Sequence, residues 1–245
     1  RIGYFHGGRT ILLYRAYINN YFEAEGINVS LITKGLRDEK FHAVPKEYDE
    51  IQFEKTYGKI SGVELVEGIL SGKFDGATIG ESSFALAVSQ GFPIIAVAEL
   101  GHDTKEKPGH AMIFVNDIII NSSQDIKGKR LGSRRAGPGD EIFLKEFLLN
   151  EGLDPYRDVQ IIHNVPDDKL KALLIKKKVD GAFHHLMSII DLVEENHTYV
   201  YRKMDWLNPE ISHSVLVFSR DFVNKNPDSI KKLTRAYMKR IAFEH

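Results

Sequence analysis

SGKFDGA, at residues 71–77, and KKVDGA, at residues 177–182, are two versions of one motif in a chain of 245 residues. Each version follows an amphipathic stretch of helical periodicity and leads into a short apolar stretch of strand length. Polar residues follow both strands: Gly80-Glu81-Ser82-Ser83 after the first and His184-His185 after the second. The repeat predicts two similar α/β lobes, each with a polar loop at the carboxyl end of a strand, that together form a ligand-binding cleft.

Composition excludes several classes of function. Hydrophobic residues make up 42% and charged residues 27% of the chain, as in ordinary globular proteins. The net charge of −1 gives no attraction to nucleic acid or to an anionic membrane, and no apolar run approaches the ~20 residues of a membrane-spanning helix. Cysteine is absent, which excludes disulfides, thiolate metal sites and cysteine nucleophiles. We therefore expect no nucleic-acid partner and no direct membrane insertion by this chain.

The first half of the chain alternates strand and helix patterns. We expect strands at 2–5, 28–33, 76–79 and 94–100, and helices at 10–24, 61–70 and 82–90. Thr10 is the expected N-cap of the first helix, and Ser61 with Glu64 forms a capping box. Residues 34–59 show no regular pattern, and a connection of that length is usually functional or mobile.

The second half repeats the alternation. We expect strands at 111–115, 159–162, 181–184 and 215–218, a turn followed by a strand within 125–132, and helices at 141–150, at 167–175 with Asp167 as the cap, and from Pro227 onward. The strands at 111–115 and 215–218 are the expected crossovers between lobes. Lobe I would then comprise residues 1–111 and 213–245, and lobe II residues 112–212. The absence of an initial Met and the helical pattern at the end suggest that both ends are trimmed.

Five short segments, in order along the chain, resemble one known family. They are YFEAEGI (21–27), GILSGKFDG (68–76), DIKGKRLG (125–132), FLLNEGLD (147–154) and DGA (180–182). Together they resemble type II periplasmic solute-binding proteins of the nitrate/sulfonate/taurine class, which are related to the binders of thiamine-pyrimidine precursors. The chain departs from that family in the long 34–59 segment and in its early end.

The resemblance implies a fold, a partner and a location. The implied fold is α/β, with two lobes that are each a mostly parallel sheet flanked by helices and that are joined by two crossover hinge strands. The implied partners are a small-molecule ligand and an ABC permease, and the implied location is periplasmic or extracytoplasmic. A domain of this kind also serves as the sensor of a membrane-bound signalling protein, in which case the chain would be tethered to a membrane.

Two loops of the first lobe are candidates for ligand binding. The loop after the first strand has two glycines that permit close backbone approach, an arginine and a helix start, which together favour an anion or carboxylate; the alternative is a tight turn with Arg9 on the surface. Ser82 and Ser83 offer hydroxyls but could also cap the helix. Glu81 could bind a ligand amine or pair with Arg9. The candidate residues are Phe5, His6, Gly8, Arg9, Thr10, Gly80, Glu81, Ser82 and Ser83.

The second lobe has equivalent loops. Arg134 and Arg135 would point to opposite sides of an extended stretch, so at most one would reach a ligand; the alternative is a solvated basic loop. His184 and His185 are a poor chelate for one metal for the same reason, and a hydrogen bond or stacking contact is expected instead. Trp206 is expected to pack, with a place at the cleft rim as the alternative. The candidate residues are Ser133, Arg134, Arg135, Gly137, His184 and His185.

The predicted function is capture of a small anionic organic molecule, such as a sulfonate or carboxylate, for uptake by an ABC transporter. A sensor domain and a binder of pyrimidine or other heterocyclic precursors are the alternatives, and an enzyme similar to thiamine-pyrimidine synthases is a less favoured one. A heterocyclic ligand is favoured by Phe5, His6, Phe183 and His184. An enzyme is not expected, because the sequence lacks GxSxG, P-loop and GxGxxG motifs and the cysteines of thiamine-pyrimidine synthases. No cofactor and no metal are predicted.

Overall fold

The computed structural model describes residues 1–7, 10–58, 60–104, 109–133, 140–203 and 211–243. Its contacts divide the chain into two compact units, which we call lobe I and lobe II. Lobe I comprises Arg1–His102 with Ser212–His245, and lobe II comprises Asp103–Ile211. The first boundary therefore falls earlier in the chain than the position after residue 111 that the sequence predicts.

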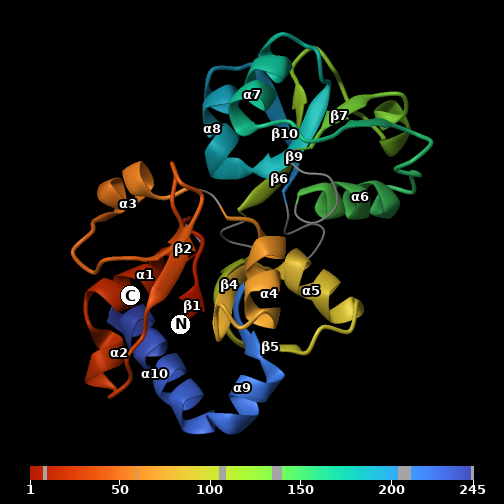
Figure 1. The fold of residues 1–245 in the computed structure, drawn as a ribbon. Helices are drawn as coiled ribbons and strands as arrows, with labels where there is room; N and C mark the ends of the chain where they lie inside the picture. Colours follow the sequence, from red (N-terminus) through yellow and green to blue (C-terminus); the bar gives the residue numbers. More distant parts are fainter. Residues whose placement is uncertain (8–9, 59, 105–108, 134–139, 204–210, 244–245) are drawn as a thin grey trace. The chain divides into compact units, whose positions relative to one another are not determined.

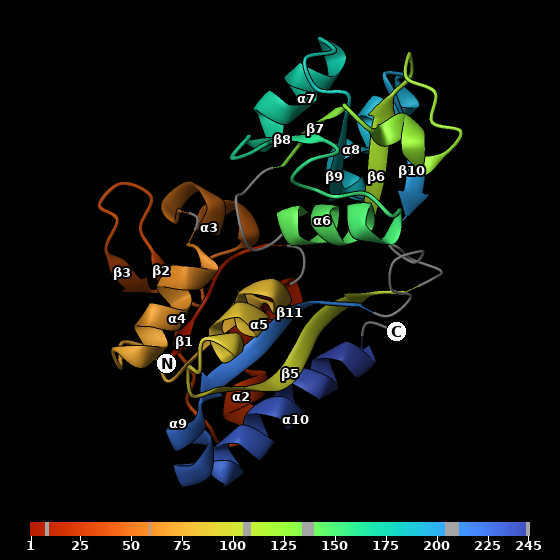
Figure 2. The same ribbon diagram turned by 90° about the vertical axis from the view of Figure 1, so that its right-hand side faces the viewer.

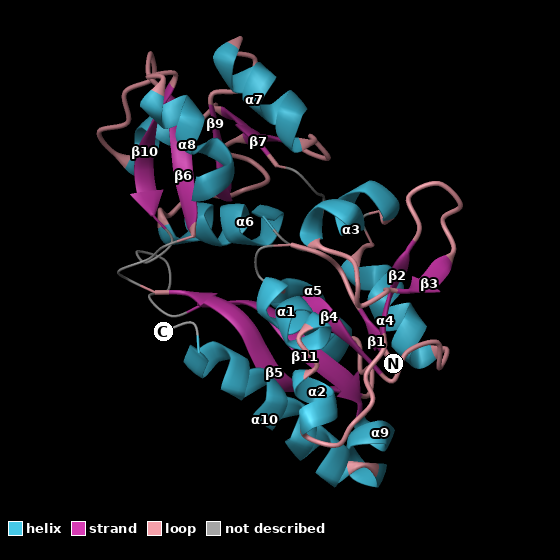
Figure 3. Ribbon diagram, turned by 90° about the vertical axis from the view of Figure 1, so that its left-hand side faces the viewer, coloured by secondary structure: helices cyan, strands magenta, loops and turns pink. Residues whose placement is uncertain are grey.

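Lobe I is built on a sheet with strand order β3-β2-β1-β4-β11-β5, whose strands are labelled in Figure 3. β1 is parallel to both β2 and β4, whereas β11 is antiparallel to β4 and β3 is antiparallel to β2. Its elements are β1 (Ile2–Gly3), α1 (Ile11–Ile18), α2 (Tyr21–Ala24), β2 (Leu31–Lys34), β3 (Phe41–Ala43), α3 (Glu50–Thr56), α4 (Gly62–Leu70), β4 (Gly76–Gly80), α5 (Glu81–Ser89), β5 (Ile94–Asp103), β11 (Ile211–Ser219), α9 (Arg220–Lys225) and α10 (Pro227–Phe243).

Helices cover both faces of this sheet (Figures 2 and 3). α1, α2 and α10 bury apolar side chains against one face, and α4 and α5 bury theirs against the other. β11 shows how the two faces are supplied: Leu216 points into the first cluster, while its neighbours Val215 and Val217 point into the second. The alternation follows from the two-residue period of a strand, so one short strand contributes to two cores.

Lobe II repeats this plan with strand order β10-β6-β9-β7-β8. α6 packs on one face of the sheet, and α7 and α8 pack on the other (Figure 1). Its elements are β6 (His110–Val115), a 3-10 turn (Ser123–Ile126), β7 (Arg130–Gly132), α6 (Asp140–Asn150), β8 (Gln160–Ile162), α7 (Asp167–Ile175), β9 (Gly181–His185), α8 (Leu186–Glu194) and β10 (Thr198–Lys203).

The repeated motif has the same backbone geometry in both lobes. Gly72 has a φ of 72°, and Lys177, at the matching place, has a φ of 55°. The left-handed conformation is natural for glycine and costly for other residues, so the second copy of the turn is strained where the first is not.

An arginine at the start of the neighbouring parallel strand anchors each copy of the motif. In lobe II an Arg130 Nη donates to Lys177 O at 3.0 Å and to Asp180 Oδ1 at 2.6 Å. In lobe I an Arg1 Nη donates to Gly72 O at 2.8 Å and to Asp75 Oδ1 at 3.3 Å. The match extends to the following strands, since β4 pairs with β1 and β11 as β9 pairs with β7 and β6.

Two predicted helices differ in detail from the observed ones: the first is broken into two, and the second begins earlier. The helix expected over residues 10–24 is two helices, because Asn20 takes a left-handed φ of 59° between α1 and α2. α5 has Gly80 rather than Ser82 at its N-cap, so Ser82 lies inside the first turn. The capping box of Ser61 and Glu64 is confirmed: Ser61 Oγ accepts from the Glu64 N–H, and Glu64 accepts from the Ser61 N–H.

Other elements differ from the sequence prediction. The N-cap of α7 is Pro166 rather than Asp167, and α8 was not predicted at all, although it follows β9 directly. Tyr199 and Tyr201 pack against a buried cluster of lobe II. Trp206 lies outside the described residues. Within those residues, no helix combines the length and apolar character needed to cross a membrane.

Residues 34–58 are built around β3 and α3, although the sequence showed no pattern in this segment. α3 begins with a capping box of Asp49 and Gln52. Tyrosine hydroxyls tie the segment to lobe I: Tyr14 donates to Tyr48 O, and Tyr17 donates to Val44 O, both at 2.7 Å. Both tyrosines belong to α1, so the segment is fastened to the core of its own lobe.

Candidate functional site

In lobe I, the predicted ligand loops meet at one edge of the sheet. β1 and β4 are adjacent and parallel, with Gly3 opposite Ala77, so their carboxyl ends lie together. The backbone ladder between them ends at that pair, and the next contact is from the Phe5 N–H to the side-chain Oγ1 of Thr78 at 3.2 Å. β1 leads into α1 on one face of the sheet and β4 leads into α5 on the other, and ligands of open α/β sheets bind at the carboxyl ends of strands whose connections diverge in this way.

Thr10 braces the loop that follows β1. It is fully buried, and its hydroxyl donates to Phe5 O at 2.8 Å and to Gly7 O at 3.1 Å. Thr10 is the N-cap residue of α1, but its side chain does not cap the helix. The hydroxyl is thus engaged in shaping the loop. Gly8 and Arg9, which belong to the predicted site, lie outside the described residues.

His6 lies among aromatic rings from α1, from α3 and from Tyr4, which follows β1. Its ring centroid lies 4.5 Å from that of Phe53 in α3 and 5.6 Å from that of Tyr14 in α1. Its Nδ1 is 3.3 Å from the hydroxyl of Tyr4. Residues 34–59 therefore supply, through Phe53, a wall of the loop predicted to bind ligand.

The polar residues that follow β4, in the first turn of α5, differ in burial and in direction. Ser82 is nearly buried and Glu81 is half-buried, at the start of α5. Ser83 packs toward α4, since a Cβ added at Gly62 would come within 2.4 Å of Ser83 Oγ. Gly80 adjoins Ser214 in β11, which is fully buried. Ser214 is a residue that the sequence analysis missed.

In lobe II, three histidines gather at the equivalent edge. His185 pairs with His110 across β9 and β6, and their ring centroids are 4.0 Å apart. The His110 ring is also stacked on Phe183 at 5.9 Å. His184 faces the opposite side of the sheet, as predicted, and its Nδ1 is 3.2 Å from His185 O. Among the described residues, no group of three or more His, Cys, Asp or Glu side chains is arranged so that it could hold a metal ion.

A buried carboxylate lies at the same edge of lobe II. Glu141, in the first turn of α6, accepts hydrogen bonds from His163 Nδ1 and Lys145 Nζ, both at 2.7 Å. Burial raises the pKa of Glu141, but these hydrogen bonds outweigh burial and leave that pKa below its usual value. Ser133 is buried after β7. Arg134, Arg135 and Gly137 lie outside the described residues.

The sequence signal for Ser214 and His110 was present but was not used. β6 and β11 run antiparallel to β9 and β4, so they begin at the edge where those strands end. Residues that precede a predicted crossover strand therefore lie at the same edge as residues that follow its antiparallel neighbour. His163 directly follows the predicted strand 159–162 and Glu141 begins the predicted helix 141–150, so both carried a comparable signal, whereas Phe53 reaches the edge only through tertiary packing.

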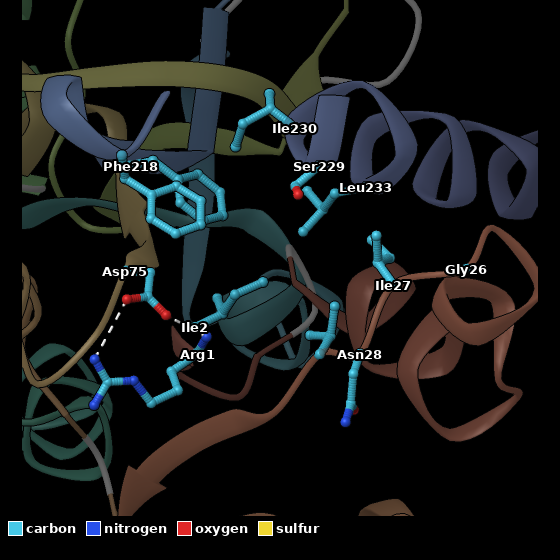
Figure 4. Close-up of a pocket in the computed structure, with 12 residues that line it drawn as sticks. Arg1, Ile2, Gly26, Ile27, Asn28, Asp75, Phe218, Ser229, Ile230 and Leu233 are labelled. Carbon is cyan, nitrogen blue, oxygen red and sulfur yellow. Dashed lines mark hydrogen bonds and ion pairs between the residues drawn. The ribbon is translucent and has the colours of Figure 1, made fainter. Parts of the chain in front are cut away.

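A pocket of about 370 Å³ lies at the other end of the lobe I sheet (Figure 4). Ile2, Asp75 and Phe218 line it, and they lie at the amino ends of β1 and β4 and at the matching end of β11. Figure 4 shows the guanidinium of Arg1 directed at Asp75, with which it pairs. This pocket is therefore separate from the predicted ligand loops.

A family model and several solved structures match the chain. The family model described as "NMT1/THI5 like" matches residues 59–243. The periplasmic aliphatic sulphonate binding protein SsuA of Escherichia coli is 16% identical with a TM-score of 0.67, over 98% of this chain and 71% of that protein. The periplasmic nitrate-binding protein NrtA of Synechocystis is 14% identical with a TM-score of 0.64, over 98% of this chain and 60% of that one.

The description of a third similar structure states its fold. A Candida albicans protein described as having the generic periplasmic binding protein fold is 16% identical with a TM-score of 0.61, over 99% of this chain and 70% of that one. No curated protein sequence matches the chain. At such low identity the structural similarity shows the fold, and it confirms the predicted two-lobed α/β class.

Proposed function

The chain belongs to the NMT1/THI5-like family, and on that premise we propose that it is an extracytoplasmic solute-binding protein for a small anionic organic molecule. The observation that carries the proposal is the edge of lobe I where the ladder between β1 and β4 ends, beside a helix start without a side-chain cap. Free N–H groups and the positive end of the helix dipole at such a place favour a negative group. The sulfonate and nitrate ligands named for similar structures support the same ligand class.

The proposal extends to partners and to the other lobe. The ligand would also contact the edge of lobe II that carries Ser133, His184 and His185, and closure on it would use the connections between the lobes as a hinge. Delivery would be to an ABC permease, because a similar structure from Methylobacillus flagellatus is described as the periplasmic sulfonate-binding protein of a putative sulfonate ABC transporter. Binding and release would then be the whole activity, without catalysis.

A ligand panel tests this function. Ligand-free protein would be melted with nitrate, ethanesulfonate, taurine, benzoate and 4-aminopyrimidine. A ligand at 100 times its Kd adds about 2.7 kcal/mol to the free energy of unfolding, which is readily seen as a rise in Tm. We expect a rise with at least one anion. No rise with any anion would contradict the proposed ligand class.

Two arginine variants test whether Arg9 takes part in anion binding. Arg9→Ala should weaken binding of the anion that gives the largest rise in Tm, because a guanidinium suits oxyanions. Arg157→Ala is the control, since that side chain is 87% exposed in lobe II. An unchanged Kd for Arg9→Ala would remove Arg9 from the site.

A heterocyclic ligand is the second candidate. The rings around His6 and around His110 favour it, because they offer faces and edges for stacking. A rise in Tm with 4-aminopyrimidine and none with the anions would move the assignment to this class.

A further inference from the structure

Ser214 is a fully buried residue whose hydroxyl forms no hydrogen bond with the residues that the structure describes. Its relative exposure is 0%, and its Oγ has no hydrogen-bond partner among the described residues. Ser212 lies two residues earlier on β11, and its Oγ is also buried and without a partner. Buried polar groups are almost always hydrogen-bonded, so an exception calls for a physical reason.

Room exists beside this hydroxyl. Ser214 is paired in register with Gly80, and directly paired residues point their side chains to the same face of the sheet, with Cβ atoms about 5 Å apart. A Cβ added at Gly80 would meet only His213 O among the described atoms within 4 Å, at 3.8 Å. The absence of a side chain at Gly80 thus leaves space next to a hydroxyl that lacks a partner.

The same place is also the start of a helix. Gly80 is the N-cap of α5, a nine-residue helix, and no side chain caps it. The first N–H groups of such a helix lack intrahelical partners and carry a partial positive charge. Glu81, half-buried, brings a carboxylate to the same edge, which suits a ligand that carries an amine beside its anionic group.

We propose that an oxyanion group of the ligand, such as a sulfonate, carboxylate or phosphonate, occupies the space over Gly80 and accepts a hydrogen bond from Ser214 Oγ. This inference rests on the proposed function and adds to it a binding residue on β11. It explains why the hydroxyl is buried without a partner, and why the residue beside it is the one without a side chain.

Two substitutions test the inference without harming the fold. Gly80 has φ −66° and ψ 146°, which alanine also adopts, and the added methyl would contact the protein only at ordinary distance. Ser214→Ala removes a hydroxyl that bonds none of the residues that the structure describes. Both variants should therefore melt at or above the temperature of wild type when ligand-free.

Binding is then measured by calorimetry with ethanesulfonate, taurine and benzoate. Ser214→Ala should weaken the wild-type interaction about ten- to hundredfold, as expected for a lost hydrogen bond to a charged group. Gly80→Ala should weaken it about tenfold or more, because its methyl takes the space of a ligand atom. Thr198→Val is the matched control: Thr198 Oγ1 is also buried without a partner, but it lies in lobe II at the start of β10.

The possible results distinguish failure of the proposed Ser214 contact from failure of the proposed function. The inference is supported if both variants bind the anion more weakly, if their ligand-free Tm is not lower than that of wild type, and if Thr198→Val binds with wild-type affinity. Wild-type affinity in either variant, or a clear drop in its ligand-free Tm, overturns the inference while the proposed function stands. Failure of wild type to bind any of the three anions contradicts the proposed function itself, and the inference falls with it.

Discussion

The two lobes share a backbone plan but fill one pair of positions in opposite ways. Four residues after Gly76 and Gly181, the strands β4 and β9 reach Gly80 and His185. Their partners on the antiparallel neighbours are Ser214 and His110. In lobe I this pair leaves room, whereas in lobe II two imidazole rings stand 4.0 Å apart.

The difference shows which parts of the repeat serve the fold and which serve a ligand. At the amino ends of the strands, both lobes keep an arginine, an aspartate and a left-handed turn in the same arrangement. At the carboxyl ends, the side chains differ in size, charge and hydrogen bonding. The shared end specifies how strands and helices pack, and the divergent end is free to specify what is bound.

The glycines that begin β4 and β9 should give the largest effects if the lobes are truly equivalent. A Cβ at Gly76 would lie 2.4 Å from Val217 O, and one at Gly181 would lie 2.5 Å from Ile113 O. Because backbone atoms cannot move aside cheaply, Gly76→Ala and Gly181→Ala should each lower the free energy of unfolding by about 3 kcal/mol. Urea denaturation followed by circular dichroism measures this.

Gly80→Ala, on the same strand as Gly76, is the control and should leave the urea midpoint nearly unchanged. Equal losses for Gly76→Ala and Gly181→Ala would support equivalence of the two packing sites. A loss below about 1 kcal/mol in one of them would show that its antiparallel neighbour is free to shift.

Asp180→Asn should have the next largest effect. Asp180 accepts hydrogen bonds from Arg130 N at 2.7 Å and from the Arg130 side chain. Burial raises the pKa of Asp180, but the bonds from Arg130 outweigh it and leave the pKa below its usual value. Loss of the charge should cost about 1–2 kcal/mol at neutral pH.

The pH dependence of that effect has a definite sign. A carboxylate whose pKa is lowered by folding stabilises the protein above its unfolded-state pKa of about 4, and this contribution is lost as pH falls through the folded-state pKa. The urea midpoints of wild type and Asp180→Asn should therefore converge below about pH 4. Asp221→Asn is the control: its partner Lys225 and Asp221 itself are about 70% exposed, so the midpoint should hardly move. A constant gap at all pH values would contradict the proposed role of the charge.

The left-handed turn should give the smallest effects, of opposite sign in the two lobes. Gly72→Ala forces a side chain into a φ of 72° and should cost about 1 kcal/mol, although no atom lies within 4 Å of the new methyl. Lys177→Gly relieves the same conformation and should stabilise lobe II by about 0.5 kcal/mol. Thermal unfolding checks both.

Lys178→Gly is the matched control for the second lobe. Lys178 is also an exposed lysine, but it is not among the residues with positive φ, so glycine there should destabilise rather than stabilise. Stabilisation by both lysine substitutions would point to charge repulsion rather than backbone strain.

Local sequence signals determined much of the architecture of this protein. The two DGA motifs, the capping box at Ser61 and Glu64, and the apolar runs that became β4, β6 and β9 predicted two similar α/β lobes, because helix and strand periodicities are properties of neighbouring residues. The ends of β4 and β9 were likewise recognisable as candidate ligand loops.

Only the tertiary structure decided which side chains stand beside those loops. Ser214 meets Gly80, His110 meets His185, and Phe53 meets His6 across gaps in sequence of 134, 75 and 47 residues. Strand order and register make these pairs, and they depend on the packing of whole layers rather than on any local pattern. The sequence therefore shows where a ligand would approach, whereas the fold shows which groups it would meet there.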